Sequence, residues 1–306
     1  MASRLLDSPS RQLKKYELRP DAPDHGRYVT KEEYWEHWYE GTVYEWNNGY
    51  LEAKPMSTPG QFNLYSWFLQ LLLQFKLALQ STQIMALETG FTMIVPDPEN
   101  PGQMKEVTRK PDIGAILLTN PILWGENDRS YHGLCDLCVE SMSDSHRSEI
   151  LRDTEIKFVE YEFAGVKEYY ILDPSHRHMH FYVLNRLGHY EELTPDADGV
   201  IRSTVLTGFQ FRQSDLDAMP SLEELALDEV YQGYVLLQYQ AAQHRAMAAE
   251  QRADAERKRA QEESRRAQEE SRRAQEESRR AQEERQRAER FARKLQELGL
   301  NPADLE

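Results

Sequence analysis

The chain has little cysteine, no long apolar run and no general excess of basic residues. Only two cysteines occur in 306 residues, which excludes a disulfide-stapled scaffold and fits a reducing compartment. No run approaches the roughly 18 consecutive apolar residues that a membrane-spanning helix needs. The first twenty residues also lack the apolar core of a signal peptide. We therefore expect a cytoplasmic protein with no membrane partner.

Acidic residues outnumber basic ones over most of the chain. The formal net charge is −15, and 37 acidic against 21 basic residues precede Ala241. Such an acidic body is a poor general binder of DNA, because non-specific affinity depends on phosphate neutralisation by Lys and Arg. Several cations nevertheless cluster in sequence and predict either a local basic groove or, as is commoner, a solvated face: Arg109, Lys110, Arg147, Arg152, Lys157 and Lys167.

Two short apolar runs each carry a carboxylate at one end. The first, residues 110–118, opens with Asp112, and the second, residues 134–140, closes with Glu140. Runs of this kind are typical of strands buried on both faces. If the two strands pair antiparallel, both carboxylates lie at one edge of a buried sheet, where a divalent metal would offset their repulsion. The alternative is that both are solvated residues at strand ends.

The helix expected after these strands, residues 148–164, places a lysine on its apolar face. Residues 143–145 and Ser148 offer candidate N-caps, and Gly165 is the expected C-terminal stop. At helical spacing Lys157 falls in the middle of a mostly apolar arc. A buried ammonium needs an anionic partner or a path to water. Lys157 therefore either meets the two carboxylates or extends to solvent.

The order of these residues resembles the PD-(D/E)xK nuclease superfamily. Its motif is matched by Asp112 directly after a proline, Glu140 on the next strand and Lys157 on the following helix. Over about residues 28–228 the chain resembles more narrowly the Uma-two family of restriction-endonuclease-like bacterial proteins, in the stretches 137–143, 153–161 and 165–174. The resemblance implies an α/β (α+β) fold, with a restriction-endonuclease-like core in which helices flank a mixed central sheet.

The resemblance also implies roles for single residues. Asp112 and Glu140 would bind Mg²⁺ or Mn²⁺, and Glu45 would complete the metal site. Lys157 would orient the attacking water or stabilise developing negative charge. The implied reaction is metal-dependent endonucleolytic hydrolysis of a DNA phosphodiester.

Three features leave alternatives open. Glu45 also fits the exposed face of a hairpin strand before an Asn48-Gly49 turn. Met142 stands where lysine stands in the superfamily's simplest form, and residues 56–63 lack a histidine that relatives often have. Together with the acidic body, these departures favour a second function: a catalytically inactive nuclease fold that serves as a binding or assembly module. Hydrolysis of a phosphodiester other than DNA is a third.

Periodicity and turn residues predict the remaining elements of the body. A short helix is expected after Thr30, and the longest apolar helix at 62–80. Strands are expected at 44–53 (a hairpin), 84–88, 91–95, 168–172, 178–184, 190–193 and 200–205, with loops at 96–107 and 120–133. The alternating His176, His178 and His180 would share one face of a strand, where an exposed hairpin edge is commoner than a metal site. Cys135 and Cys138 are expected to be small buried residues.

The C-terminal part is a repeat. Alanine recurs every seven residues from Ala246 to Ala288, which predicts a long charged helix. Two positions of each seven-residue repeat form the contact surface, or seam, of a coiled coil, and in this repeat alanine fills one and glutamate the other. The helix therefore either pairs weakly through its ends, near Val235 and Phe291, or acts as a solvated spacer. We expect a flexible lead-in at 1–27, a nuclease-like domain at 28–228 and a helical, coiled-coil-like tail at 229–306. The expected partners are DNA and a second copy of the tail.

Overall fold

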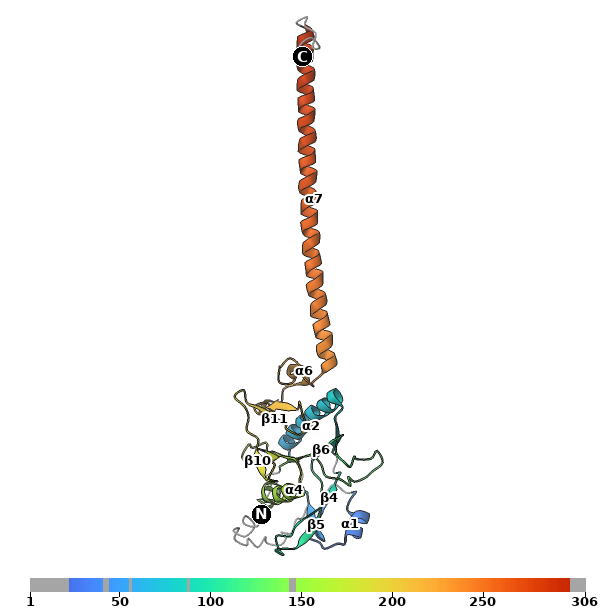
Figure 1. Ribbon diagram of the computed structural model, residues 1–306, viewed down its shortest axis with the longest axis vertical. Helices are drawn as coiled ribbons and strands as arrows, with labels where there is room; N and C mark the ends of the chain where they lie inside the picture. Colours follow the sequence, from blue (N-terminus) through green and yellow to red (C-terminus); the bar gives the residue numbers. More distant parts are fainter. Residues whose placement is uncertain (1–21, 41–43, 55–56, 87–88, 143–146, 298–306) are drawn as a thin grey trace. The chain divides into compact units, whose positions relative to one another are not determined.

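The computed structural model describes residues 22–40, 44–54, 57–86, 89–142 and 147–297 (Figure 1). The chain divides into two compact units, Met1–Gln240 and Ala241–Glu306. Most of the expected lead-in lies outside the described residues. The division places the candidate site residues together in the first unit.

The first unit contains short strands and mostly short helices in alternation. The helices are α1 (Lys31–His37), α2 (Pro59–Leu79), α3 (Arg147–Leu151), α4 (Lys157–Ala164), α5 (Asp215–Ala218) and α6 (Leu222–Leu225). The strands are β1 (Tyr44–Asn47), β2 (Tyr50–Ala53), β3 (Thr82–Met85), β4 (Phe91–Pro96), β5 (Met104–Arg109), β6 (Ile113–Leu117), β7 (Leu137–Ser141), β8 (Glu168–Leu172), β9 (His180–Leu184), β10 (Tyr190–Glu192), β11 (Val200–Arg202) and β12 (Gln210–Arg212).

The strands form an antiparallel sheet, a mixed sheet and a two-stranded ribbon. The first has the order β2-β1-β5-β4, the second β10-β9-β8-β7-β6-β3, and β11 pairs with β12. In the six-stranded sheet β7 and β8 are parallel and the other neighbours are antiparallel. The helical segment from α3 to α4 supplies the crossover that a parallel pair requires. The expected mixed α/β architecture is confirmed.

Helices cover both faces of the six-stranded sheet (Figure 1). Phe68 and Leu72 of α2 pack in one apolar cluster with Val139 of β7. Tyr161 of α4 belongs to a second cluster, which includes strands of both sheets. Because side chains alternate along a strand, Glu140 points away from α2 and meets Tyr161, whose hydroxyl donates to it. This alternation decides which helix faces the candidate site.

Local sequence signals account for the element ends. Asn48 and Gly49 both have positive φ, 47° and 96°, as a two-residue hairpin turn requires. Thr30 caps α1 and Thr58 caps α2, each in a capping box. The Thr58 cap explains why α2 begins at Pro59, earlier than the apolar periodicity alone predicts.

Two of the predicted boundaries are wrong. The expected loop at 96–107 contains the start of β5, and the expected strand at 110–118 begins only at Ile113. Pro111 lies between them, where the chain leaves the four-stranded sheet and enters the six-stranded one. A proline cannot donate to a strand ladder, which makes it suited to this crossing. The crossing places Asp112 at the junction of the two sheets.

The expected helix at 148–164 is present but contains a π turn, η1 (Arg152–Ile156), between α3 and α4. It ends at Gly165, which has φ 93°, as expected for a C-terminal glycine. The candidate caps at 143–145 lie outside the described residues. The buried face is not the apolar arc that regular helical spacing predicts, because it carries Glu149, Asp153 and Lys157.

The long helix α7 (Leu237–Glu297) confirms the predicted helical tail. Its predicted seam is wrong at one end, because Val235 precedes the helix and is buried in the core of the first unit. At the other end Phe291 is 64% exposed. Among the described residues, no helix combines the length and apolar character needed to span a bilayer.

Candidate functional site

Asp112 and Glu140 lie side by side, as the antiparallel pairing of their strands requires. The register pairs Ile113 of β6 with Val139 of β7. Asp112, which precedes Ile113, therefore stands beside Glu140, which follows Val139. The Asp112 Oδ2 atom accepts a hydrogen bond of 2.7 Å from the Ser141 main-chain N–H. One strand end therefore holds both carboxyl groups at the junction of the two sheets.

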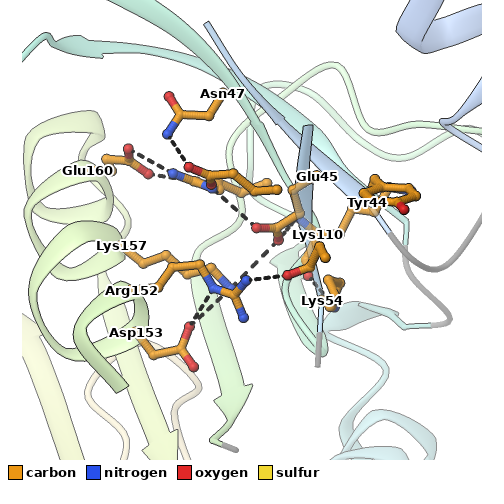
Figure 2. Close-up of polar contacts among 12 residues, drawn as sticks. Tyr44, Glu45, Asn47, Lys54, Lys110, Arg152, Asp153, Lys157 and Glu160 are labelled. Atoms are coloured by element: carbon orange, nitrogen blue, oxygen red, sulfur yellow. Dashed lines mark hydrogen bonds and ion pairs between the residues drawn. The ribbon is translucent and has the colours of Figure 1, made fainter. Parts of the chain in front are cut away.

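Lys157 reaches Glu140 of this pair from the helical segment. Its Nζ lies 2.8 Å from Glu140 Oε2, 3.3 Å from Asp153 Oδ1 and 3.6 Å from Glu45 Oε1. The side chain is almost completely buried, which excludes the solvent-extended alternative. Figure 2 shows Lys157, Arg152 and Asp153 projecting from this segment. Lys157 thus has the anionic partners that its burial requires.

Glu45 is fully buried on β1, so its alternative place on an exposed hairpin face is wrong. Its Oε1 accepts from the Lys110 main-chain N–H at 2.9 Å, and its Oε2 accepts from the Arg109 guanidinium at 3.2 Å. With Lys157 also beside Oε1, both oxygens of Glu45 are already engaged. The structure brings Glu45 to the site, where it lies beside Lys157 (Figure 2).

A buried group of charged residues, here named the ionic layer, joins the four-stranded sheet to the helical segment. Arg109 is its centre: the guanidinium pairs with Glu45, with Glu52 and, at 2.7 Å, with Glu160. Glu160 also pairs with Lys105 at 3.3 Å. The members are Glu45, Glu52, Lys105, Arg109, Arg152, Asp153, Lys157 and Glu160, all buried.

The ionic layer changes how we interpret the cations that cluster in sequence between Arg109 and Lys167. Arg109, Lys110, Arg152 and Lys157 are buried in internal contacts, so they form neither a basic groove nor a solvated face. The helical spacing of Glu149, Asp153 and Lys157 carried a signal for this arrangement that apolar periodicity missed. The π turn lies within this stretch, a feature common at functional sites.

Burial and neighbouring charges shift the ionisation of the site residues. Burial, reinforced by the Asp112 and Asp153 carboxylates, raises the pKa of Glu140 to about 8 against the opposing pull of Lys157. Burial also disfavours the charged form of Lys157, but Glu140 and Glu45 outweigh it and raise the Lys157 pKa above its usual range. For Glu45, Lys157 and Arg109 outweigh the burial and lower the pKa below its usual range.

The exposed side of the site is formed by Asp112 and Lys54. The Asp112 side chain is 21% exposed and that of Lys54 9%. Lys54 Nζ donates to Asp112 Oδ1 at 3.1 Å and to the Lys110 carbonyl at 2.8 Å. Sequence reasoning missed Lys54, because nothing local to residue 54 points to residues 110 and 112.

The donor set fits a small divalent cation held by two carboxylates. Within the described ranges, no three His, Cys, Asp or Glu side chains are grouped to hold a metal ion. Mg²⁺ commonly takes only one or two carboxylates and completes its shell with water and phosphate oxygens. Asp112 and Glu140 supply two carboxylates, whereas the nearby Asp153 Oδ1 is paired with the Lys157 ammonium at 3.3 Å. Glu45 fits less well, because it is fully buried and pairs with the Arg109 guanidinium as well as with Lys157.

The remaining candidate residues lie elsewhere. His176 has φ 59° and pairs with Asp217, whereas His180 begins β9 and pairs with Glu192 at 3.0 Å. They do not share one strand face, so the histidine metal site is not formed. Cys135 and Cys138 are buried free thiols, as expected. Met142, at the usual lysine position, is buried in the core, and the ammonium beside Glu140 is that of Lys157.

Two comparisons with known proteins found a match. A crystal structure described as "a putative nuclease belonging to DUF820" from Anabaena variabilis ATCC 29413 is similar, with 14% sequence identity and a TM-score of 0.47 over 62% of this chain and 98% of that chain. No curated protein matches. The family model "Uma2: Putative restriction endonuclease" matches residues 32–217. Because this match covers more than half of the chain, the protein belongs to the Uma2 family.

Proposed function

We propose that the protein is a Mg²⁺-dependent endonuclease that hydrolyses DNA phosphodiester bonds. The observation that carries the proposal is the convergence of Asp112, Glu140 and Lys157, with Lys157 Nζ 2.8 Å from Glu140 Oε2. Glu140 comes from β7, Lys157 from α4 and Asp112 from the junction just before β6, and a structural role alone does not require these three residues at one place.

Asp112 and Glu140 would hold Mg²⁺ or Mn²⁺, which would supply an activated water and neutralise charge on the scissile phosphate. Glu140 is fixed by the Tyr161 hydroxyl, which donates to its Oε1 at 2.9 Å. Lys157, buried beside Glu140, would stabilise negative charge that develops near the metal. Glu45 acts through Lys157, because its carboxylate pairs with the ammonium and holds it in place.

The proposal is tested by Mn²⁺ and Mg²⁺ calorimetry on the full chain, together with cleavage of mixed DNA substrates. We expect Asp112→Asn to abolish metal binding and cleavage, because it removes a charged ligand at the open side. Lys157→Met should abolish cleavage, because it removes the cation beside Glu140. Asp196→Asn, which removes a carboxylate from an exposed pair with Arg202, is the matched control and should leave both unchanged. A folded wild-type chain that binds no metal at millimolar concentration would exclude this function.

One observation favours the second function, an inactive nuclease fold used for binding or assembly. The cations near the site are buried in the ionic layer, so they do not contribute a phosphate-binding surface, on which DNA affinity depends. Metal binding without cleavage of any nucleic acid would support this second function. The tail would then be the main interaction element.

We also propose weak self-association through the C-terminal end of α7. Phe291 is exposed and stands seven residues after Glu284, in the second core position of the heptad, where it would pack against a second copy. The glutamates of the repeat limit the apolar seam, so the expected association is weak.

A further inference from the structure

We propose that Lys54 is a built-in occupant of the metal site, whose ammonium leaves Asp112 when a divalent cation binds. The inference rests on the proposed metal site at Asp112 and Glu140 and adds a residue that controls its affinity. It also concerns the ion alone, so it is tested without reference to DNA cleavage.

The contacts of Lys54 resemble those of a bound cation. Its ammonium lies 3.1 Å from a carboxylate oxygen, Asp112 Oδ1, and 2.8 Å from a main-chain carbonyl, that of Lys110. Carboxylate and carbonyl oxygens are also the donors that hard divalent cations take. The Lys54 side chain is 9% exposed, so it lies in the site and not on the surface. A metal ligated by Asp112 would compete directly for this oxygen.

The Lys54 ammonium is also the group that a metal ion would displace most easily from the site. The other Asp112 oxygen accepts from the main-chain N–H of Ser141, which is fixed in β7. Glu140 is held by Tyr161, which is fully buried, and by Lys157, which is held by two further carboxylates. Lys54 follows β2 and reaches the site through a flexible four-carbon stem. It is the cation on Asp112, which is the more exposed of the two proposed ligands.

The exchange predicts that removing the ammonium strengthens metal binding. A fixed positive charge beside Asp112 repels a divalent ion, and it must be displaced before the ion binds. In calorimetry on the full chain, Lys54→Met should bind Mn²⁺ about tenfold more tightly than wild type. Lys54→Gln, which keeps a donor but no charge, should shift the affinity in the same direction.

A control lysine–aspartate pair lies at the start of β7, whose other end carries Glu140. Lys167 pairs with Asp136 at 2.6 Å, just before β7. Lys167→Met therefore removes one lysine charge and one lysine–aspartate pair, outside the proposed metal site. Its Mn²⁺ affinity should equal that of wild type. Equal strengthening in both variants would mean that only net charge matters, which would overturn the exchange.

Thermal unfolding provides a second readout. Without metal, Lys54→Met should lower the melting temperature, because Asp112 loses its cation. With saturating Mn²⁺ this difference should disappear, because the pair is already broken in the metal-bound wild type. A loss of melting temperature that is the same with and without Mn²⁺ would show that Lys54 stays on Asp112, and would overturn the proposal.

The two proposals fail in different ways. If neither wild type nor Lys54→Met binds Mn²⁺, the proposed metal site itself fails. If wild type binds Mn²⁺ in an Asp112-dependent manner but Lys54→Met does not bind more tightly, only the exchange fails. If only Lys54→Met binds Mn²⁺, the ammonium is not displaced in wild type, which would overturn the exchange.

Discussion

At the residue scale, the carboxyl group of Glu140 is in an unfavourable place for a charge. It is buried beside Asp112 and Asp153, and its pKa is raised to about 8 even though Lys157 lies 2.8 Å away. A group of this kind costs free energy of folding when it ionises. Such groups are also typical of sites that bind a cation or a proton during function.

This shift predicts a pH dependence of stability. Because the folded-state pKa of Glu140 lies above its usual value of 4.5, folding favours the protonated form. The stabilisation is complete below the ordinary pKa and is lost as the pH rises through about 8. The free energy of unfolding should fall by on the order of 5 kcal/mol between these limits. Urea titrations at several pH values measure it.

The matched variant isolates the residue responsible. Glu140→Gln cannot ionise, so its free energy of unfolding should lose this downward trend while other groups titrate as in wild type. If the free energy of unfolding of the variant depends on pH as strongly as that of wild type, another group is responsible. The burial of Glu140 would then destabilise its charged form less than expected.

The residues of the motif could be predicted from the sequence, and those that support them could not. Asp112, Glu140 and Lys157 follow from strand-end positions and helical spacing within a single stretch. Lys54 and Glu45 meet that stretch only because two sheets join at Pro111. A contact between segments about 60 residues apart leaves no local periodicity, so Lys54 carried no signal of its own and Glu45 was indicated only by the family resemblance.

At the element scale, the helical segment from α3 to α4 packs a charged face against the sheet that carries β1 and β5. Periodicity of apolar residues failed here, because the most buried positions are polar and a π turn changes the phase of the helix. The segment's ends were predictable, since Gly165 marks its stop. The partners of its charges were not, because they lie on distant strands.

Arg109 should therefore be essential to the packing of this element. Arg109→Met leaves three buried carboxylates, those of Glu45, Glu52 and Glu160, without their shared cation. Removing one partner from a buried ionic group typically costs about 3–5 kcal/mol, measured here as the loss in free energy of unfolding in urea. Arg202→Met, which removes an arginine from an exposed pair with Asp196, is the control and should have little effect. Equal stability of the two variants would contradict a structural role for the ionic layer.

At the scale of the whole molecule, the chain combines a compact unit with a helix of 61 residues. The sequence predicted this helix from its seven-residue repeat, but it predicted the seam at Val235 wrongly. That residue lies in a cluster with aromatic side chains of the first unit. A buried position that continues a heptad by chance cannot be recognised before the fold is known.

Self-association of the full chain should be weak and should depend on the far end of α7. Sedimentation of the full chain should give a concentration-dependent dimer with a dissociation constant above about 1 μM. Phe291→Ala should remain monomeric over the same range, because Phe291 is the largest exposed apolar residue of that end. Leu187→Ala, which removes an exposed apolar side chain of the first unit, is the control. A chain that is monomeric at all concentrations would make α7 a spacer.

The hydrogen bond from the Tyr161 hydroxyl to Glu140 Oε1 gives the site an optical reporter of its own. The near-ultraviolet absorption of a phenol that donates to a carboxylate changes when a bound cation offsets the negative charge of that carboxylate. Occupancy of the site by an ion would therefore be visible as a tyrosine difference spectrum in the unlabelled protein. Tyr161→Phe would remove that signal while leaving the two carboxylates in place.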